Sequence, residues 1–148
     1  MKLITTFIAL TVVASATMIS SPLLASGDNE HHKHHHKHQL VDVSQQPNIP
    51  SVDVEVTPDA TAGWNLQIKT HNFEFAPQNA NKKHVHGQGH AHLYVNGEKI
   101  GRLYGHWHHL PKLGAGEHSI KVTLNTNDHG AYAVNGTEIA VEKIINEE

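Results

Sequence analysis

The sequence predicts an all-β domain of the sandwich type, preceded by an export signal and a histidine-rich tail. Three observations lead to this prediction. Apolar residues alternate with polar ones in several short runs, turn-forming pairs separate these runs, and no segment carries a long apolar repeat of 3.6 residues. The chain is 148 residues long and contains 16 histidines, which directs the search for function toward metal binding.

The first 25 residues have the pattern of a secretory signal peptide. Lys2 precedes the apolar run 3–13, and a stretch rich in small residues ends near Leu23-Leu24-Ala25. The apolar run is too short to span a bilayer as a helix, and no later run approaches 18 residues. We therefore expect residues 1–25 to be removed on export. The mature protein is expected to be periplasmic or secreted, without membrane insertion.

A disordered tail and linker are expected over residues 26–50. The tract 31–38 has no apolar periodicity, so it should lack a fixed structure in the absence of metal. Flexible imidazoles bind borderline metals weakly and in several geometries, which suits capture or buffering of ions. The alternative is a solvated tail without a metal role. The histidines of this tract are His31, His32, His34, His35, His36 and His38.

The folded domain is expected over residues 51–148. Valines alternate with acidic residues in the segment 52–56, which predicts the first strand. The same two-residue period runs through 64–75, so this segment should also be extended. The loop 78–89 that follows is long and polar, which is typical of a loop that carries a functional site.

Two Asn-Gly pairs predict tight hairpins, one at residues 96–97 and one at 135–136. Between them, apolar and polar residues alternate over 118–124, which predicts a further strand. The total is about seven short strands. This number and spacing are typical of a single antiparallel β-sandwich of the cupredoxin-like or immunoglobulin-like kind, and a small barrel is the alternative.

Composition narrows the chemistry of any metal site. The chain has no cysteine, and both methionines, Met1 and Met18, lie in the predicted signal. A site in the mature protein must therefore use imidazole, carboxylate or backbone groups, which favours copper(II), zinc or nickel over copper(I). The 11 basic and 14 acidic residues nearly balance, and no basic stripe interleaves with aromatic residues. Nucleic acid is therefore not expected as a partner.

The most favourable ligand spacing is that of His90 and His92, at the start of a predicted strand. Residues two apart on a strand project from the same face, about 7 Å apart along the chain, so their imidazoles can converge on one ion. The turn at 96–97 should bring residues 102–104 beside them and place residues 106–109 just beyond that end of the strand pair. The competing interpretation for each histidine is a solvated or hydrogen-bonded side chain, and we expect this for His71 and His118. The primary metal candidates are His90, His92, His109 and His129, and the secondary candidates are His84, His86, His106 and His108.

The segment Gly89-His90-Ala91-His92-Leu93-Tyr94-Val95-Asn96-Gly97, continued through 102–111 to Asn127-Asp128-His129, resembles small exported bacterial domains linked to copper handling. These domains have a cupredoxin-like or immunoglobulin-like fold. The resemblance covers roughly residues 73–141. It implies that the metal ligands are to be sought at His90, His92, His109 and His129. The sequence departs from electron-transfer blue-copper proteins, whose site requires a cysteine thiolate, so fast electron transfer is not implied.

Three functions compete. The favoured one is a non-catalytic protein that captures, buffers or delivers copper(II), with zinc as the second candidate, in exchange with another exported metal-handling protein. The second is a metalloenzyme, either like superoxide dismutase or another copper oxidoreductase, and the missing cysteine pair argues against the dismutase. The third is a β-sandwich used for adhesion or protein contacts, with pH-sensitive histidines. Imidazoles scattered over the surface would favour this third function. We expect no catalytic residues.

Overall fold

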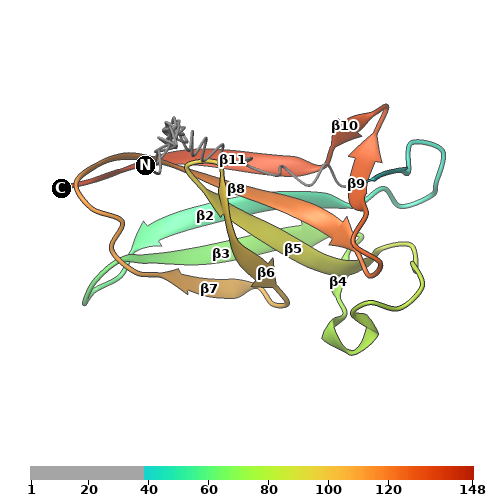
Figure 1. The fold of residues 1–148 in the computed structure, drawn as a ribbon, viewed down its shortest axis with the longest axis horizontal. Coiled ribbons are helices and arrows are strands. Elements are labelled where there is room, and N and C mark those ends of the chain that lie inside the picture. Colours follow the sequence, from blue (N-terminus) through green and yellow to red (C-terminus); the bar gives the residue numbers. More distant parts are fainter. Residues whose placement is uncertain (1–38) are drawn as a thin grey trace, which may run out of the picture. The chain divides into compact units, whose positions relative to one another are not determined.

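The computed structural model describes residues 39–148 and shows an all-β domain with two sheets (Figure 1). The described residues form eleven strands and one short 3₁₀-helix, η1 (Pro77–Asn79). The predicted signal peptide and the histidine tract lie outside the described residues. Within residues 39–148, no helix is long and apolar enough to cross a membrane.

The larger sheet, sheet A, contains eight strands. Its central order is β1 (Leu40–Asp42), β9 (Ala131–Val134), β8 (Gly116–Thr126), β5 (Gln88–Val95) and β4 (Glu74–Phe75). Three further strands pair beside this path: β10 (Thr137–Glu138) with β9, β11 (Ala140–Glu147) with β8, and β6 (Glu98–Leu103) with β5. The pairs β1–β9 and β4–β5 are parallel, so the prediction of a purely antiparallel sandwich was wrong in these two places.

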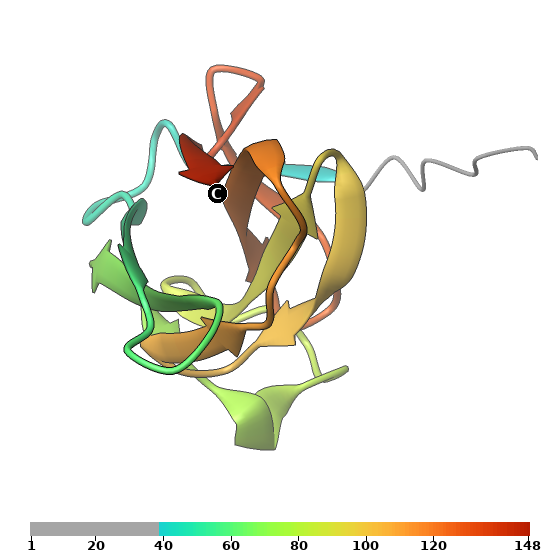
Figure 2. The same ribbon diagram turned by 90° about the vertical axis from the view of Figure 1, so that its left-hand side faces the viewer.

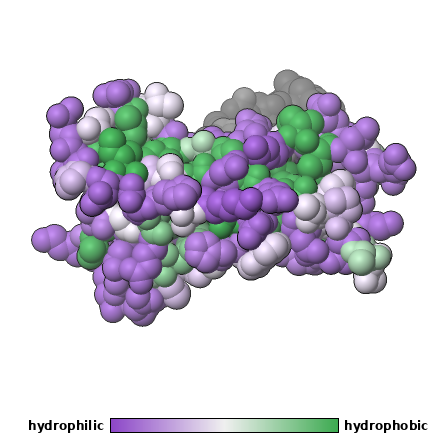
Figure 3. All heavy atoms as spheres, turned by 180° about the vertical axis from the view of Figure 1, so that it is seen from behind, coloured by the Kyte–Doolittle hydropathy of each residue, from purple (hydrophilic) through white to green (hydrophobic). Residues whose placement is uncertain are grey.

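Sheet B has three antiparallel strands, β2 (Ser51–Pro58), β3 (Trp64–His71) and β7 (Trp107–Leu110), in that order. Seen end on, the strands of both sheets surround a common interior (Figure 2). Leu66 and Ile68 of β3 enter this interior from sheet B, and Leu93 of β5 enters it from sheet A; all three are at most 1% exposed. Seen from behind, hydrophilic residues dominate the surface and apolar residues show between them (Figure 3). The two-residue period predicted from the sequence therefore separates the core from the surface.

Both predicted hairpins are confirmed. Asn96 and Gly97 have φ values of 51° and 79°, and Asn135 and Gly136 have 50° and 75°. Positive φ at both central residues is the geometry of the two-residue turn that Asn-Gly favours. The predicted neighbours of the first hairpin are also confirmed, because Ala91 pairs with Leu103 and His92 pairs with Arg102.

The fold begins before the predicted boundary at residue 51. Strand β1 pairs with β9, and Val43 packs in the core at 2% exposure, so residues 40–50 belong to the folded domain rather than to a linker. A strand of three residues is too short to show a period in the sequence. Strand β11 was also missed, because Ile145 is its one buried residue and the alternation along it is incomplete.

Tyr132 links the core to the long loop before β5, and it provides a test of stability at alkaline pH. Its hydroxyl donates to the carbonyl oxygens of Val85, at 3.2 Å, and of Gln88, at 3.0 Å. Burial raises the pKa of Tyr132 to about 12. The neutral phenol is thus favoured in the folded state, so its contribution to stability is full below about pH 10 and is lost as the pH rises toward 12.

We expect Tyr132→Phe to lower the free energy of unfolding by about 1 kcal/mol at neutral pH, because the one hydroxyl proton that the two carbonyl oxygens share is lost. The variant should also show a flatter fall in stability above pH 10 than the unaltered protein. Urea unfolding at a series of pH values from 8 to 11 measures both effects. Identical slopes for the two proteins would contradict this account of Tyr132.

Candidate metal centre

Strand β5 holds His90 and His92 on the face opposite the apolar core. Ala91 and Leu93 point from this strand into the core, so the histidines between and beside them project from the other face. Both histidine side chains are nevertheless fully buried, at 0% exposure. Their Nε2 atoms lie 3.0 Å apart, and their ring centroids lie 4.8 Å apart. The predicted convergence of these two imidazoles is confirmed.

The neighbours of this histidine pair are aromatic and basic. The ring of Tyr104 lies 5.4 Å from the ring of His90, and the ring of Tyr94 lies 6.3 Å from that of His92, measured between centroids. The Nζ atom of Lys99 lies 3.0 Å from Nε2 of His92. Burial, followed by the nearby charge of Arg102, lowers the pKa of Lys99.

The contact with Lys99 determines where the protons lie. A lysine ammonium can only donate, so Nε2 of His92 is the acceptor and carries a lone pair. Since the same Nε2 also faces Nε2 of His90 at 3.0 Å, the proton between the two rings must be on His90. The lone pair of His92 is thus shared by two donors, one on each side.

A β-bulge turns Lys99 toward the histidines. The pairing of β5 with β6 shifts by one residue after Leu93, so that Leu93 faces Gly101 while Tyr94 faces Lys99. Ile100 is the extra residue, and it is 51% exposed. Without this shift Lys99 would lie on the core face of the strand, because one step of register exchanges the two faces. For this reason the contact between Lys99 and His92 could not be predicted from the sequence.

His129 is the third imidazole of the cluster. It lies in the loop between β8 and β9 with a φ of 71°, and its ring centroid is 5.4 Å from that of His90. Its Nε2 atom hydrogen-bonds to Oδ1 of Asn81, a second residue that the sequence analysis did not single out. The loop is held by the hydroxyl of Thr126, which donates to the Asp128 carboxylate and thereby lowers its pKa. His90, His92 and His129 are therefore brought together.

His109 lies elsewhere, because its strand pairs with the other sheet. Strand β7 adds to β3, so His109 pairs with Asn65, and its Nδ1 lies 3.4 Å from Oδ1 of that residue. His106 is on the same side of the fold, where its Nδ1 donates to the carbonyl oxygen of Ile68 at 2.9 Å. His108 pairs with Leu66, and burial lowers its pKa. All three histidines contact sheet B, and the ring of His106 also lies 5.1 Å from that of Phe75 in sheet A, measured between centroids.

The two histidines of the loop before β5 make separate contacts. The ring of His84 lies 5.5 Å from that of Tyr132, and burial lowers the pKa of His84. Nε2 of His86 donates to the carbonyl oxygen of Pro47 at 2.8 Å. His118 has the structural role expected of it, since both of its ring nitrogens hydrogen-bond, one to Asn96 and one to Gly114.

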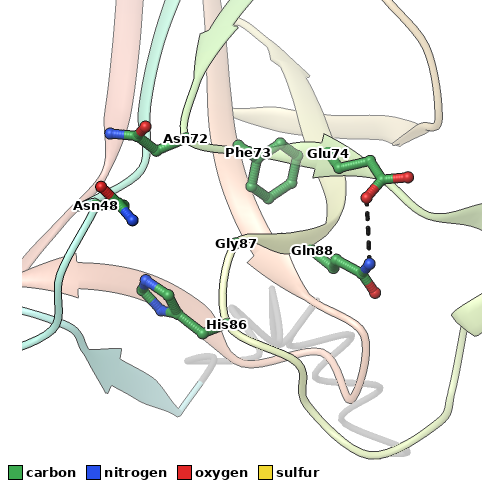
Figure 4. A pocket seen from close by; sticks show the side chains of 7 residues that line it. All are labelled: Asn48, Asn72, Phe73, Glu74, His86, Gly87 and Gln88. Carbon is green, nitrogen blue, oxygen red and sulfur yellow. Dashed lines mark hydrogen bonds between the residues drawn. The ribbon is translucent and has the colours of Figure 1, made fainter.

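A polar pocket adjoins this loop but does not include the histidine pair (Figure 4). His86 lies on one side of it, near Asn48, and the amide of Gln88 donates to the Glu74 carboxylate at 3.2 Å on the other. Because Nε2 of His86 is already bonded to Pro47, this imidazole fixes the loop to the chain before β2. We therefore place the candidate site at His90 and His92 rather than in this pocket.

No family model matches the chain. Likewise, no curated protein and no solved structure gives a match. The resemblance to exported copper-handling domains thus stays a prediction.

The described part of the chain holds no group of three or more histidine, aspartate or glutamate side chains already arranged around a common ion position. The histidine pair still passes a simple geometric test for two ligands. If both Nε2 atoms bind one ion at about 2 Å, their separation of 3.0 Å corresponds to an angle of about 97° at the ion. Two of the required ligand atoms are therefore at the right separation before any metal binds.

Proposed function

We propose that this protein is an exported, non-catalytic binder of transition-metal ions, with copper(II) preferred and zinc second, and that His90 and His92 are its primary ligands. The observation that carries the proposal is the 3.0 Å separation of their Nε2 atoms in a fully buried position. In the metal-free protein the two buried imidazoles hydrogen-bond to each other, and His92 also to Lys99. A shared ion would replace these hydrogen bonds with two metal–nitrogen bonds.

The 3.0 Å separation of the two Nε2 atoms favours copper(II) over zinc. Neighbouring ligands in a square-planar or tetragonal site subtend about 90° at the metal, and those in a tetrahedral site about 109°. The value of about 97° derived from the 3.0 Å separation is closer to the first geometry. The lack of cysteine in the chain agrees with a borderline ion bound by nitrogen rather than a soft ion bound by sulfur.

His129 is the proposed third ligand. Its ring is 5.4 Å from that of His90, and it lies on a loop, so a rotation of its side chain away from Asn81 would bring a nitrogen toward the pair. The remaining positions would be filled by water or backbone oxygen. In this proposal His109 is not a ligand, because its contacts are with sheet B.

The predicted tract at 31–38 is proposed to collect ions outside the cytoplasm and to raise their concentration near the folded domain. Burial of both primary ligands favours retention of an ion over turnover of a substrate on it. Capture, buffering or delivery is thus preferred to catalysis. The competing interaction sandwich is disfavoured, because three of the imidazoles cluster rather than scatter.

The test is calorimetric titration with copper(II) and with zinc, on the exported chain and on the same chain with every tract histidine replaced by glutamine. We expect the substituted chain to keep one tight copper(II) equivalent and to bind zinc at least about tenfold more weakly, as the Irving–Williams order predicts. The unsubstituted chain should bind additional, weaker equivalents. Loss of all tight binding on substitution of the tract would refute a site in the folded domain.

A further inference from the structure

Lys99 connects the buried histidine pair with solvent. The lysine residue is exposed, on the edge strand β6, whereas the His92 side chain that its amine contacts is fully buried. The 3.0 Å contact is made to Nε2, the same atom that faces His90. The ammonium therefore sits at the one nitrogen of His92 that both the pair and an incoming ion would use.

We propose that Lys99 is a displaceable cap on the histidine pair. In the metal-free protein its ammonium shares the lone pair of His92 Nε2 with the N–H of His90. Before an ion can bind both rings, the ammonium must swing into solvent and the proton of His90 must move from Nε2 to Nδ1 or to solvent. This inference rests on the proposed function, because it concerns access to the same two histidines. It adds a residue that sets both the affinity and the rate of metal entry.

The Lys99 ammonium and a metal ion compete for the same lone pair of His92, and this competition supports the proposed cap. The in-plane lone pair of an imidazole nitrogen can be given to a metal ion or to a hydrogen-bond donor, but not fully to both. An ammonium also repels a divalent cation at this distance, so the bound ion and the inward position of Lys99 exclude each other. The long, flexible lysine stem makes the outward position easily reached. The bulge at Ile100 directs the amine to His92, so the contact depends on a specific feature of the strand pair.

The cap is tested with Lys99→Met and with Arg102→Met as the matched control, both in the full chain with the tract histidines replaced. Arg102 pairs with His92 across the ladder and lowers the pKa of Lys99 through its charge, so its removal takes away the same charge from the same face. We expect Lys99→Met to bind copper(II) about tenfold more tightly and to load faster in stopped-flow measurements, because a charge-assisted hydrogen bond no longer competes. Arg102→Met should change affinity less than about threefold.

A second measurement does not depend on metal. In ¹⁵N spectra of the metal-free proteins, the Nε2 resonance of His92 should move in Lys99→Met and stay in place in Arg102→Met, since only the first variant loses the donor. Equal affinity changes in the two variants, or an unmoved His92 resonance, would overturn the cap while leaving the metal site intact. A parent chain that binds no copper(II) would overturn the proposed function and the cap together.

Discussion

Replacing His90 and His92 together by asparagine is expected to weaken copper(II) binding at least about 100-fold in the chain without tract histidines. Loss of residues that merely orient a metal ligand typically costs about 10-fold to 100-fold in affinity, so loss of two ligands should cost more. Asparagine keeps a polar group at each buried position and limits the damage to packing. Competition titration against a chelator of known affinity measures the effect, and circular dichroism checks the fold.

His109→Asn is the matched control for this pair. It exchanges the same side chains at a residue that the sequence analysis ranked equally but that the structure places beside Asn65 in sheet B. We expect its copper(II) affinity to stay within about twofold of the parent chain, because sites without shared partners act independently. A large loss in His109→Asn, or a small one in the double variant, would remove the site from β5.

Gly89→Ala is expected to destabilise the fold by about 3 kcal/mol, because a side chain there has no space. A Cβ atom on Gly89 would overlap the backbone carbonyl of Asn125 on the neighbouring strand β8, and a backbone atom cannot turn aside. Since Gly89 directly precedes His90, the forced separation of β5 from β8 should also weaken metal binding. Urea unfolding and copper(II) titration measure the two effects.

Gly101→Ala provides the comparison in the same sheet. A Cβ atom at Gly101 meets nothing within 4 Å, so this substitution should change stability by less than about 0.5 kcal/mol. If both glycine variants were equally stable, the close approach of β5 and β8 at Gly89 would not be a constraint on the fold.

The strands with a complete alternation of apolar and polar residues could be predicted from the sequence. The valines of β2, the hairpins at the two Asn-Gly pairs and the register of His92 with Arg102 all follow from local rules of period and turn geometry. The short strand β1 could not be predicted, since its three residues show no period and are held by pairing with β9, far along the chain. The switch of β7 to sheet B is likewise a long-range pairing that local sequence does not encode.

The candidate metal site could be predicted only in part, because local sequence determines the spacing of its histidines but not the long-range contacts around them. The spacing of His90 and His92 alone places both rings on one face, and the structure confirms that they meet. Their burial, the approach of His129 and the approach of Lys99 depend on a loop conformation and a one-residue bulge. Residues 106–109 were expected just beyond the end of the strand pair near His90 and His92, whereas β7 pairs with β3 in sheet B.

Crystals of the protein loaded with one equivalent of copper(II) would show whether one ion binds between His90 and His92. An anomalous difference map at the copper absorption edge locates the ion without assumptions about its ligands. We predict a single strong peak about 2 Å from Nε2 of both histidines, with the Lys99 amine turned into solvent. A peak beside His109 or His86, with none at the histidine pair, would contradict it.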